Sequence, residues 1–167
     1  GKWGSRGSGD ESFEYPYDIY IAPDGTVFVA DTFNHRIQTF KLRLTVLNKW
    51  GSNGVGEGKF VEIYGIAAAP DGTIYVSDYG DPNIQRFDSS GSYLGGWDFD
   101  ILLGPFSGNF WGVSVATDGR ICVADTGYHR ILCLTSDDKI YWGSQGTADG
   151  QFNFPKGVAI APDGTLY

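Results

Sequence analysis

The stretch that decides the fold is APDGTVFVAD, at residues 22–31. It returns as APDGTIYVSD at 69–78 and as ATDGRICVAD at 116–125, and a shorter copy, APDGTLY, occupies 161–167. The first aspartate of each copy stands at position 24, 71, 118 or 163, so the spacings are 47, 47 and 45 residues. A second marker has the same spacings: Trp3, Trp50, Trp97 and Trp142. Two independent markers with one period predict a structural repeat.

Each period has the pattern of four short strands. In the first period, the apolar segment 17–22 leads into a Pro-Asp-Gly turn, where Pro pre-sets the bend and Gly accepts a positive φ. Further β-rich segments follow at 26–30, 36–40 and 44–50. A four-stranded unit repeating every 45 to 47 residues is typical of a β-propeller blade. A sandwich would not repeat so regularly, and leucine-rich and helical repeats have other periods.

We therefore predict an all-β fold, a β-propeller of four-stranded antiparallel blades of which about three and a half are present. The chain divides into the tail of a preceding blade at 1–3, full blades at 17–50, 63–97 and 109–142, and a partial blade at 155–167. Propellers close with about four to eight blades, and an open segment leaves strand edges unpaired. We expect the remaining blades in a longer chain. The alternative is closure as a homo-oligomer, or a head-to-tail fibre.

Charge and hydropathy argue against two classes of partner. The chain has 12 Lys+Arg and 20 Asp+Glu, a net charge of −8. This acidity argues against a nucleic-acid partner, because such binding rests on Lys and Arg that neutralise phosphates. The longest apolar runs, such as 66–69, are far shorter than the roughly 20 residues of a membrane-spanning helix, so we expect no membrane span.

The repeated text resembles the NHL repeat. The resemblance is clearest in DTFNHRIQ at 31–38 and DTGYHRIL at 125–132, and GQFNFPKGVAI at 150–160 looks like the start of a blade in that family. The second copy departs from it, with Pro82 and Asn83 where His and Arg are expected. The resemblance implies that the innermost strand comes first in each blade. It also implies that the Asp-Thr-x-x-His loops and the inter-blade loops share one face, with the Pro-Asp-Gly turns on the other.

The loop face carries the candidate binding residues. They are Asp31, Asn34, His35 and Arg36 in the first copy, Asp78 in the second, and Trp111, Asp125, Tyr128, His129 and Arg130 in the third. They could contact a ligand, or they could form a structural network in which Asp accepts backbone hydrogen bonds and Arg pairs with a carboxylate. Repetition in successive blades favours the structural network. The alignment gives Trp111 no counterpart, since Tyr17, Gly65 and Gly157 occupy similar places, and we expect it to line the channel or the loop face.

No catalytic or metal site emerges from the sequence. His35 and His129 are the only histidines, and no Cys or carboxylate cluster accompanies them at metal-ligand spacing. The chain has no P-loop, no Gly-x-Ser-x-Gly and no dinucleotide-binding fingerprint. We predict no catalytic residues, no metal and no cofactor.

Cys122 and Cys133 are placed by the register of one hairpin. If Asp125 faces Arg130, then the two cysteines also face each other, because both pairs of residue numbers sum to 255. Directly opposed Cβ atoms lie close to the separation that a disulfide requires. The pair is therefore a candidate disulfide, which would indicate an extracellular, cell-surface or periplasmic location. The alternative is two free, buried thiols.

The same arrangement resembles a disulfide-bearing blade of the peptidyl-hydroxyglycine lyases, which are secreted propeller enzymes. That resemblance implies the disulfide. It does not imply the zinc site, since the position that matches a zinc-binding His holds Phe110.

The sequence favours a non-enzymatic binding or scaffold propeller. Its partner would be a protein, a peptide or a glycan, or further copies of the chain. The alternative function is a metal-dependent propeller enzyme of the lyase or lactonase kind, with an active site completed by blades outside this sequence.

Overall fold

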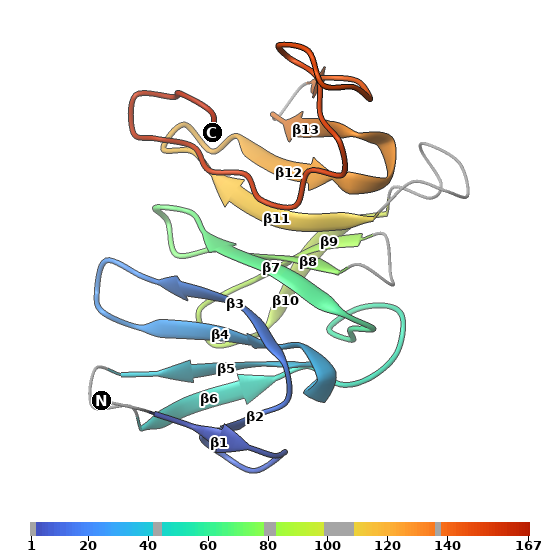
Figure 1. The fold of residues 1–167 in the computed structure, drawn as a ribbon. Helices are drawn as coiled ribbons and strands as arrows, with labels where there is room; N and C mark the ends of the chain where they lie inside the picture. Colours follow the sequence, from blue (N-terminus) through green and yellow to red (C-terminus); the bar gives the residue numbers. More distant parts are fainter. Residues whose placement is uncertain (1–2, 42–44, 79–82, 99–108, 136–137) are drawn as a thin grey trace.

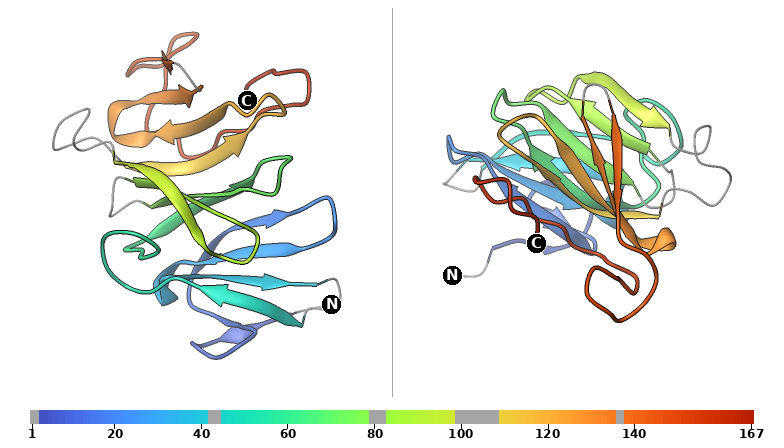
Figure 2. Two further views of the ribbon diagram at one scale, coloured as in Figure 1. Left: turned by 180° about the vertical axis from the view of Figure 1, so that it is seen from behind. Right: turned by 90° about the horizontal axis from the view of Figure 1, so that it is seen from above.

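The computed structural model describes residues 3–41, 45–78, 83–98, 109–135 and 138–167. Three four-stranded antiparallel sheets follow one another along the molecule, as Figure 1 and the reverse view in Figure 2 show. Residues 1–2 of the expected N-terminal tail and Pro82 of the departing second copy lie outside the described residues.

Each sheet is one blade, and its strands are ordered as in the sequence. Blade 1 consists of β3 (Pro16–Ile21), β4 (Val27–Asp31), β5 (Arg36–Phe40) and β6 (Val46–Trp50). Blade 2 consists of β7 (Ile63–Ala68), β8 (Ile74–Asp78), β9 (Asn83–Phe87) and β10 (Tyr93–Asp98). Blade 3 consists of β11 (Phe110–Val115), β12 (Ile121–Asp125), β13 (Arg130–Leu134) and β14 (Lys139–Trp142). The all-β propeller prediction is confirmed.

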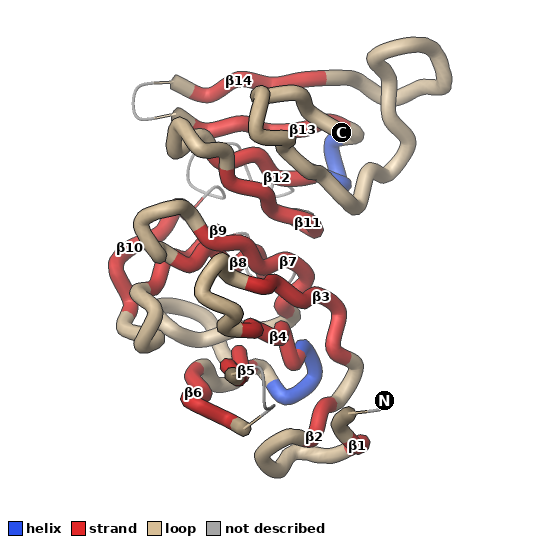
Figure 3. Tube along the Cα trace, turned by 90° about the vertical axis from the view of Figure 1, so that its left-hand side faces the viewer, coloured by secondary structure: helices blue, strands red, loops and turns tan. Residues whose placement is uncertain are grey.

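Short paired segments precede and follow the three blades. Ahead of blade 1, β1 (Ser5–Arg6) pairs in parallel with β2 (Ser12–Phe13). After blade 3, Ala159 and Tyr167 exchange backbone hydrogen bonds of 2.9 and 2.8 Å around the last Pro-Asp-Gly turn, which is the start of a fourth hairpin. The described helical residues form two 3-10 turns, η1 (Thr32–Asn34) and η2 (Thr126–Tyr128), blue in Figure 3 at the ends of β4 and β12. No helix among the described residues is long and apolar enough to cross a membrane.

The core lies between neighbouring blades. The first strands β3, β7 and β11 lie side by side, so each second strand is covered by the adjacent sheet. All five residues of β4, β8 and β12 are buried for this reason. One face of β3 remains open, with Ile19 57% and Ile21 63% exposed. The tryptophan at the end of blade 1 belongs to the core, because Trp50 contacts Phe28 at 6.3 Å and Phe87 at 6.1 Å between ring centroids.

Candidate binding face

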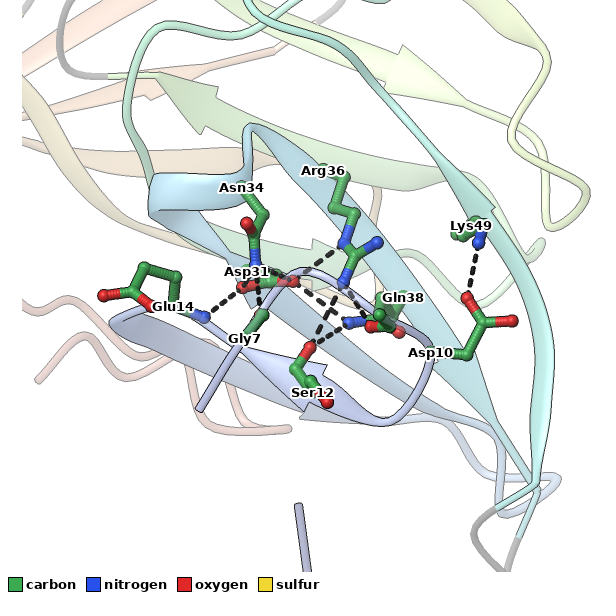
Figure 4. Close-up of polar contacts among 10 residues, drawn as sticks. Gly7, Asp10, Ser12, Glu14, Asp31, Asn34, Arg36, Gln38 and Lys49 are labelled. Carbon is green, nitrogen blue, oxygen red and sulfur yellow. Dashed lines mark hydrogen bonds and ion pairs between the residues drawn. The ribbon is translucent and has the colours of Figure 1, made fainter. Parts of the chain in front are cut away.

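Asp31 is the centre of the loop network in blade 1. Its side chain is fully buried at the end of β4. Asp31 Oδ1 accepts the backbone N–H of Glu14 at 2.8 Å, and Oδ2 accepts Arg36 Nε at 2.8 Å and Gln38 Nε2 at 3.0 Å. The amide of Asn34 donates to both oxygens at 3.0 Å. Figure 4 shows these donors converging on the one carboxylate.

The same donors hold the segment that leads into blade 1. Asn34 donates to Gly7 O at 2.9 Å, and Arg36 Nη2 donates to Gly9 O at 2.8 Å and to Ser12 O at 3.1 Å. Gln38 also donates to Ser12 O, at 2.8 Å. These polar groups therefore fasten residues 7–14 onto the blade that follows. These donated hydrogen bonds all stay within the protein, whereas the buried Gln38 Oε1 has no hydrogen-bond partner among the described residues.

The network recurs in the other blades with different partners. Asp78 accepts the backbone N–H groups of Val61 at 2.7 Å and Glu62 at 2.6 Å. Asp125 accepts Arg130 Nε at 2.7 Å. Burial raises the pKa of Asp125, and the hydrogen bond and charge of Arg130 partly oppose that rise. The Arg130 guanidinium also lies 4.6 Å from the ring centroid of Tyr128 and 4.2 Å from that of Tyr141.

Thr and His of the same loops reach the next blade. Thr32 Oγ1 donates to Ile63 O at 2.6 Å, and His35 Nδ1–H donates to Val61 O at 2.6 Å. The third copy repeats this junction, where Thr126 Oγ1 donates to Pro155 O at 2.5 Å and His129 Nδ1 accepts Phe154 N–H at 3.1 Å. His35 and His129 sit in left-handed backbone, with φ of 54° and 55°.

The two histidines thus lie at two different blade junctions. Among the described residues there is no group of three or more His, Cys, Asp or Glu that could hold a metal ion. Phe110, at the position where the lyase resemblance would need a His, is fully buried opposite Asp125. The described part of the chain therefore does not assemble the metal site of the enzyme alternative.

Trp111 has counterparts in both other blades, so the expectation that it has none is wrong. In each blade the first strand has one residue more than the second at a register irregularity, which lies between Pro16 and Asp18, between Ile63 and Gly65, and between Phe110 and Val113. The equivalent residues at these irregularities are Tyr17, Tyr64 and Trp111, not Tyr17, Gly65 and Trp111. The shared spacing of 47 residues between the three could have revealed them in the sequence.

These three side chains form a continuous aromatic row across the inner strands. Tyr17 and Tyr64 lie 4.7 Å apart between ring centroids, and Tyr64 stacks on Trp111 at 4.2 Å. The row extends from Tyr17 to Phe33 at 6.5 Å, and from Phe33 to Tyr15 at 5.0 Å. We call these five residues the aromatic rim. Sequence reasoning singled out only its Trp111.

A groove of about 490 Å³ begins at the aromatic rim and runs along β3, β7 and β11. Tyr17, Tyr64, Trp111 and Lys156 are among its lining residues, as is Asp18. Asp18 Oδ2 accepts the backbone N–H of Ile66 at 2.8 Å, which joins the inner strands of blades 1 and 2. Burial raises the pKa of Asp18, although hydrogen bonds from Ile66 and Ile19 lower it in part.

The cysteines of blade 3 form the expected disulfide. Cys122 and Cys133 are directly opposite in the β12–β13 register, together with the pair Asp125 and Arg130. Both cysteines are buried, and Phe152, Val158, Ile160 and Leu166 pack against them.

The NHL repeat family matches the chain twice, at residues 13–40 and 111–141. This chain carries NHL repeats. The two matches span the Asp-Thr-x-x-His loops of blades 1 and 3, the loops whose Thr and His contact the following blade. No curated protein matches the sequence at a significant level.

Solved structures share the propeller fold at low sequence identity. Virginiamycin B lyase from Staphylococcus aureus is 17% identical with a TM-score of 0.67, and the match covers 90% of this chain and 47% of that one. Hydrazine synthase from Kuenenia stuttgartiensis is 20% identical with a TM-score of 0.67, covering 90% and 40%. A chain of the nidogen/laminin complex is 24% identical with a TM-score of 0.58, covering 85% and 50%. This chain thus spans half or less of the length of each of these proteins, and the similarity shows the fold alone.

Proposed function

We propose that these NHL repeats form a rigid, non-enzymatic binding surface whose contact area is the aromatic rim. The observation that supports this is the continuous row of ring contacts across three blades, in which Tyr15, Tyr17 and Phe33 remain 57, 47 and 43% exposed. Exposed aromatic side chains gathered in one place are typical of interaction sites. The partner class is a protein or peptide, since such rings contribute large contact area at low cost in conformational entropy.

The polar loops have a different role in this proposal. Arg36, Asn34 and Gln38 donate hydrogen bonds to the Asp31 carboxylate and to the backbone of residues 7–12, and Thr32 and His35 donate to the next blade. They hold the inner strands at a fixed spacing and so fix the spacing of the rim. We infer an oxidising compartment, extracellular or periplasmic, from the disulfide.

The test compares a rim variant with a variant at an exposed apolar residue elsewhere on the surface. The rim variant is Tyr17→Ala combined with Tyr64→Ala, and the control is Leu47→Ala, on the outer strand β6 and 51% exposed. The proteins are screened against peptide and glycan arrays, and hits are measured by isothermal titration calorimetry. We expect peptide hits that the control retains and the rim variant loses. Equal binding by both variants would place the site elsewhere, and chemical change in recovered ligands would show an enzyme.

A further inference from the structure

Lys156 already occupies one end of the aromatic rim. Its ammonium nitrogen lies 4.0 Å from the ring centroid of Trp111, whose ring also stacks on Tyr64. Among the described residues no carboxylate forms an ion pair with Lys156. An aromatic face therefore holds this cation, through attraction between positive charge and the negative face of the ring.

The rest of the rim offers the same kind of surface without a cation on it. Tyr17, Phe33 and Tyr15 continue the row and are each more than two-fifths exposed. Among the described residues, no Lys or Arg lies over their rings as Lys156 lies over Trp111. The contact between Lys156 and Trp111 is thus an example, within the chain itself, of a cation held by a ring of the rim.

The charges around the rim favour a cationic partner. Glu62 Oε2 accepts the Tyr64 hydroxyl at 3.0 Å, which places a carboxylate beside the row. Glu14, next to Tyr15, already accepts hydrogen bonds from Arg6 Nε and Nη2 at 2.8 to 3.1 Å, so its charge is paired within the chain. The net charge of −8 attracts basic partners over longer distances.

We propose that the aromatic rim binds a basic peptide segment, whose arginine or lysine side chains lie on Tyr17, Phe33 and Tyr15 as Lys156 lies on Trp111. This inference rests on the binding function proposed above and specifies its partner. Arginine suits the site best, because its planar guanidinium stacks on aromatic faces and is weakly hydrated. Lys156 acts in this scheme as an internal occupant that competes for the Trp111 end of the rim.

The probe is a fluorescein-labelled peptide of alternating arginine and glycine, measured by fluorescence anisotropy against the whole chain. The same peptide with glutamine in place of arginine is its matched control. We expect the arginine peptide to bind and the glutamine peptide to bind more weakly. Added salt should weaken the binding only in part, since stacking is screened less than a surface ion pair.

Three variants test the contact. Phe33→Leu keeps an apolar side chain but removes the ring, and should weaken binding about threefold, the size of one exposed cation–π contact. Lys156→Gln frees the Trp111 face and should tighten binding. Lys41→Gln removes the same charge at a lysine that pairs with Asp24 of the Pro-Asp-Gly turn, away from the rim. Lys156→Gln should therefore tighten binding more than Lys41→Gln does. Thermal melts establish that each variant is folded.

The outcomes separate this inference from the proposed function. Equal binding of the arginine and glutamine peptides, with loss in the Tyr17→Ala and Tyr64→Ala variant, would overturn the basic partner and keep the rim as a binding site. Arginine-peptide binding that none of the rim substitutions changes would overturn both. Equal effects of Lys156→Gln and Lys41→Gln would show simple charge attraction and contradict the aromatic contact. Tighter binding of a single-stranded RNA than of the peptide would also overturn it.

Discussion

Arg36 and Asp31 face each other across β5 and β4, with 2.8 Å between Nε and Oδ2. The Asp31 side chain is fully buried and the Arg36 side chain is 11% exposed. Arg130 and Asp125 stand in the same relation in blade 3, 2.7 Å apart. The pair therefore recurs in the two copies that keep the arginine, and its contribution is expected in stability.

Arg36→Ala should destabilise the protein strongly. The substitution leaves the buried carboxylate of Asp31 with its neutral donors only, and breaking a buried ion pair from one side costs about 3 kcal/mol. The matched control is Arg6→Ala, which breaks an ion pair to Glu14 in which the Arg6 side chain is 80% exposed. Urea unfolding should show a lower midpoint for Arg36→Ala and little change for Arg6→Ala. Similar midpoints for the two variants would mean that Asp31 does not need this arginine.

The disulfide should be fully formed and should stabilise blade 3. A thiol titration in denaturant should find no free thiols before reduction and two after it, because Cys122 and Cys133 are the only cysteines. Replacing both by Ala should cost about 3 kcal/mol, the chain-entropy value for a short closed loop. The comparison is urea unfolding of the double variant against the oxidised protein. Two thiols in the unreduced protein would contradict the disulfide and remove the argument for an oxidising compartment.

Gly65→Ala should disturb the contact between blades 2 and 3. A Cβ at Gly65 would overlap the Trp111 carbonyl oxygen and would lie 2.6 Å from Ser77 Oγ and 2.9 Å from Val113 N. Because these are backbone and buried groups, the strands must separate, and overpacking of this kind costs about 1 to 3 kcal/mol. Gly157→Ala is the control, since its Cβ would meet nothing within 4 Å. Thermal melts should separate the two variants. A stable Gly65→Ala protein would show that the inner strands are less closely fixed than the rim requires.

The sequence predicted the parts of this structure that depend on local register. A short hairpin loop fixes which residues face each other, so the Asp125–Arg130 pair also located Cys122 opposite Cys133. The blades were predicted from the period of the repeat, because each copy contains the same four-strand pattern. Trp111 was aligned wrongly with Gly65, although all three blades share the same strand irregularity and the 47-residue period matches Trp111 with Tyr64.

Contacts between blades were beyond sequence reasoning. Thr32 and Ile63 O are 31 residues apart, and nothing in either local pattern requires them to meet. The same holds for Lys156 and Trp111, which come together where the segment after blade 3 runs beside β11 and Lys156 O accepts the Gly112 N–H at 2.8 Å. The aromatic rim depends on such contacts, so its residues other than Trp111 became candidates only in the structure.

Asp18 and Asp24 should titrate on opposite sides of the ordinary aspartate pKa of 3.8. Burial raises the pKa of Asp18, whereas hydrogen bonds from the backbone and hydroxyl of Thr26 lower that of the exposed Asp24. Carbon-13 NMR of the side-chain carboxyls should resolve the two midpoints. A midpoint for Asp18 at or below that of Asp24 would contradict the burial of this carboxylate between the inner strands.

The two shifts have opposite consequences for stability. The folded protein binds the Asp18 proton more tightly than the unfolded chain does, so this group lowers the free energy of unfolding as pH rises from 3.8 through its raised folded pKa. Asp24 instead contributes stability above 3.8, and that contribution is lost as pH falls through its lowered folded pKa. In urea unfolding, Asp18→Asn should therefore change how the free energy of unfolding varies with pH only above pH 3.8. Asp24→Asn should change that variation only below pH 3.8. If both variants changed the pH dependence of unfolding in the same pH range, burial would not raise the pKa of Asp18 above that of Asp24.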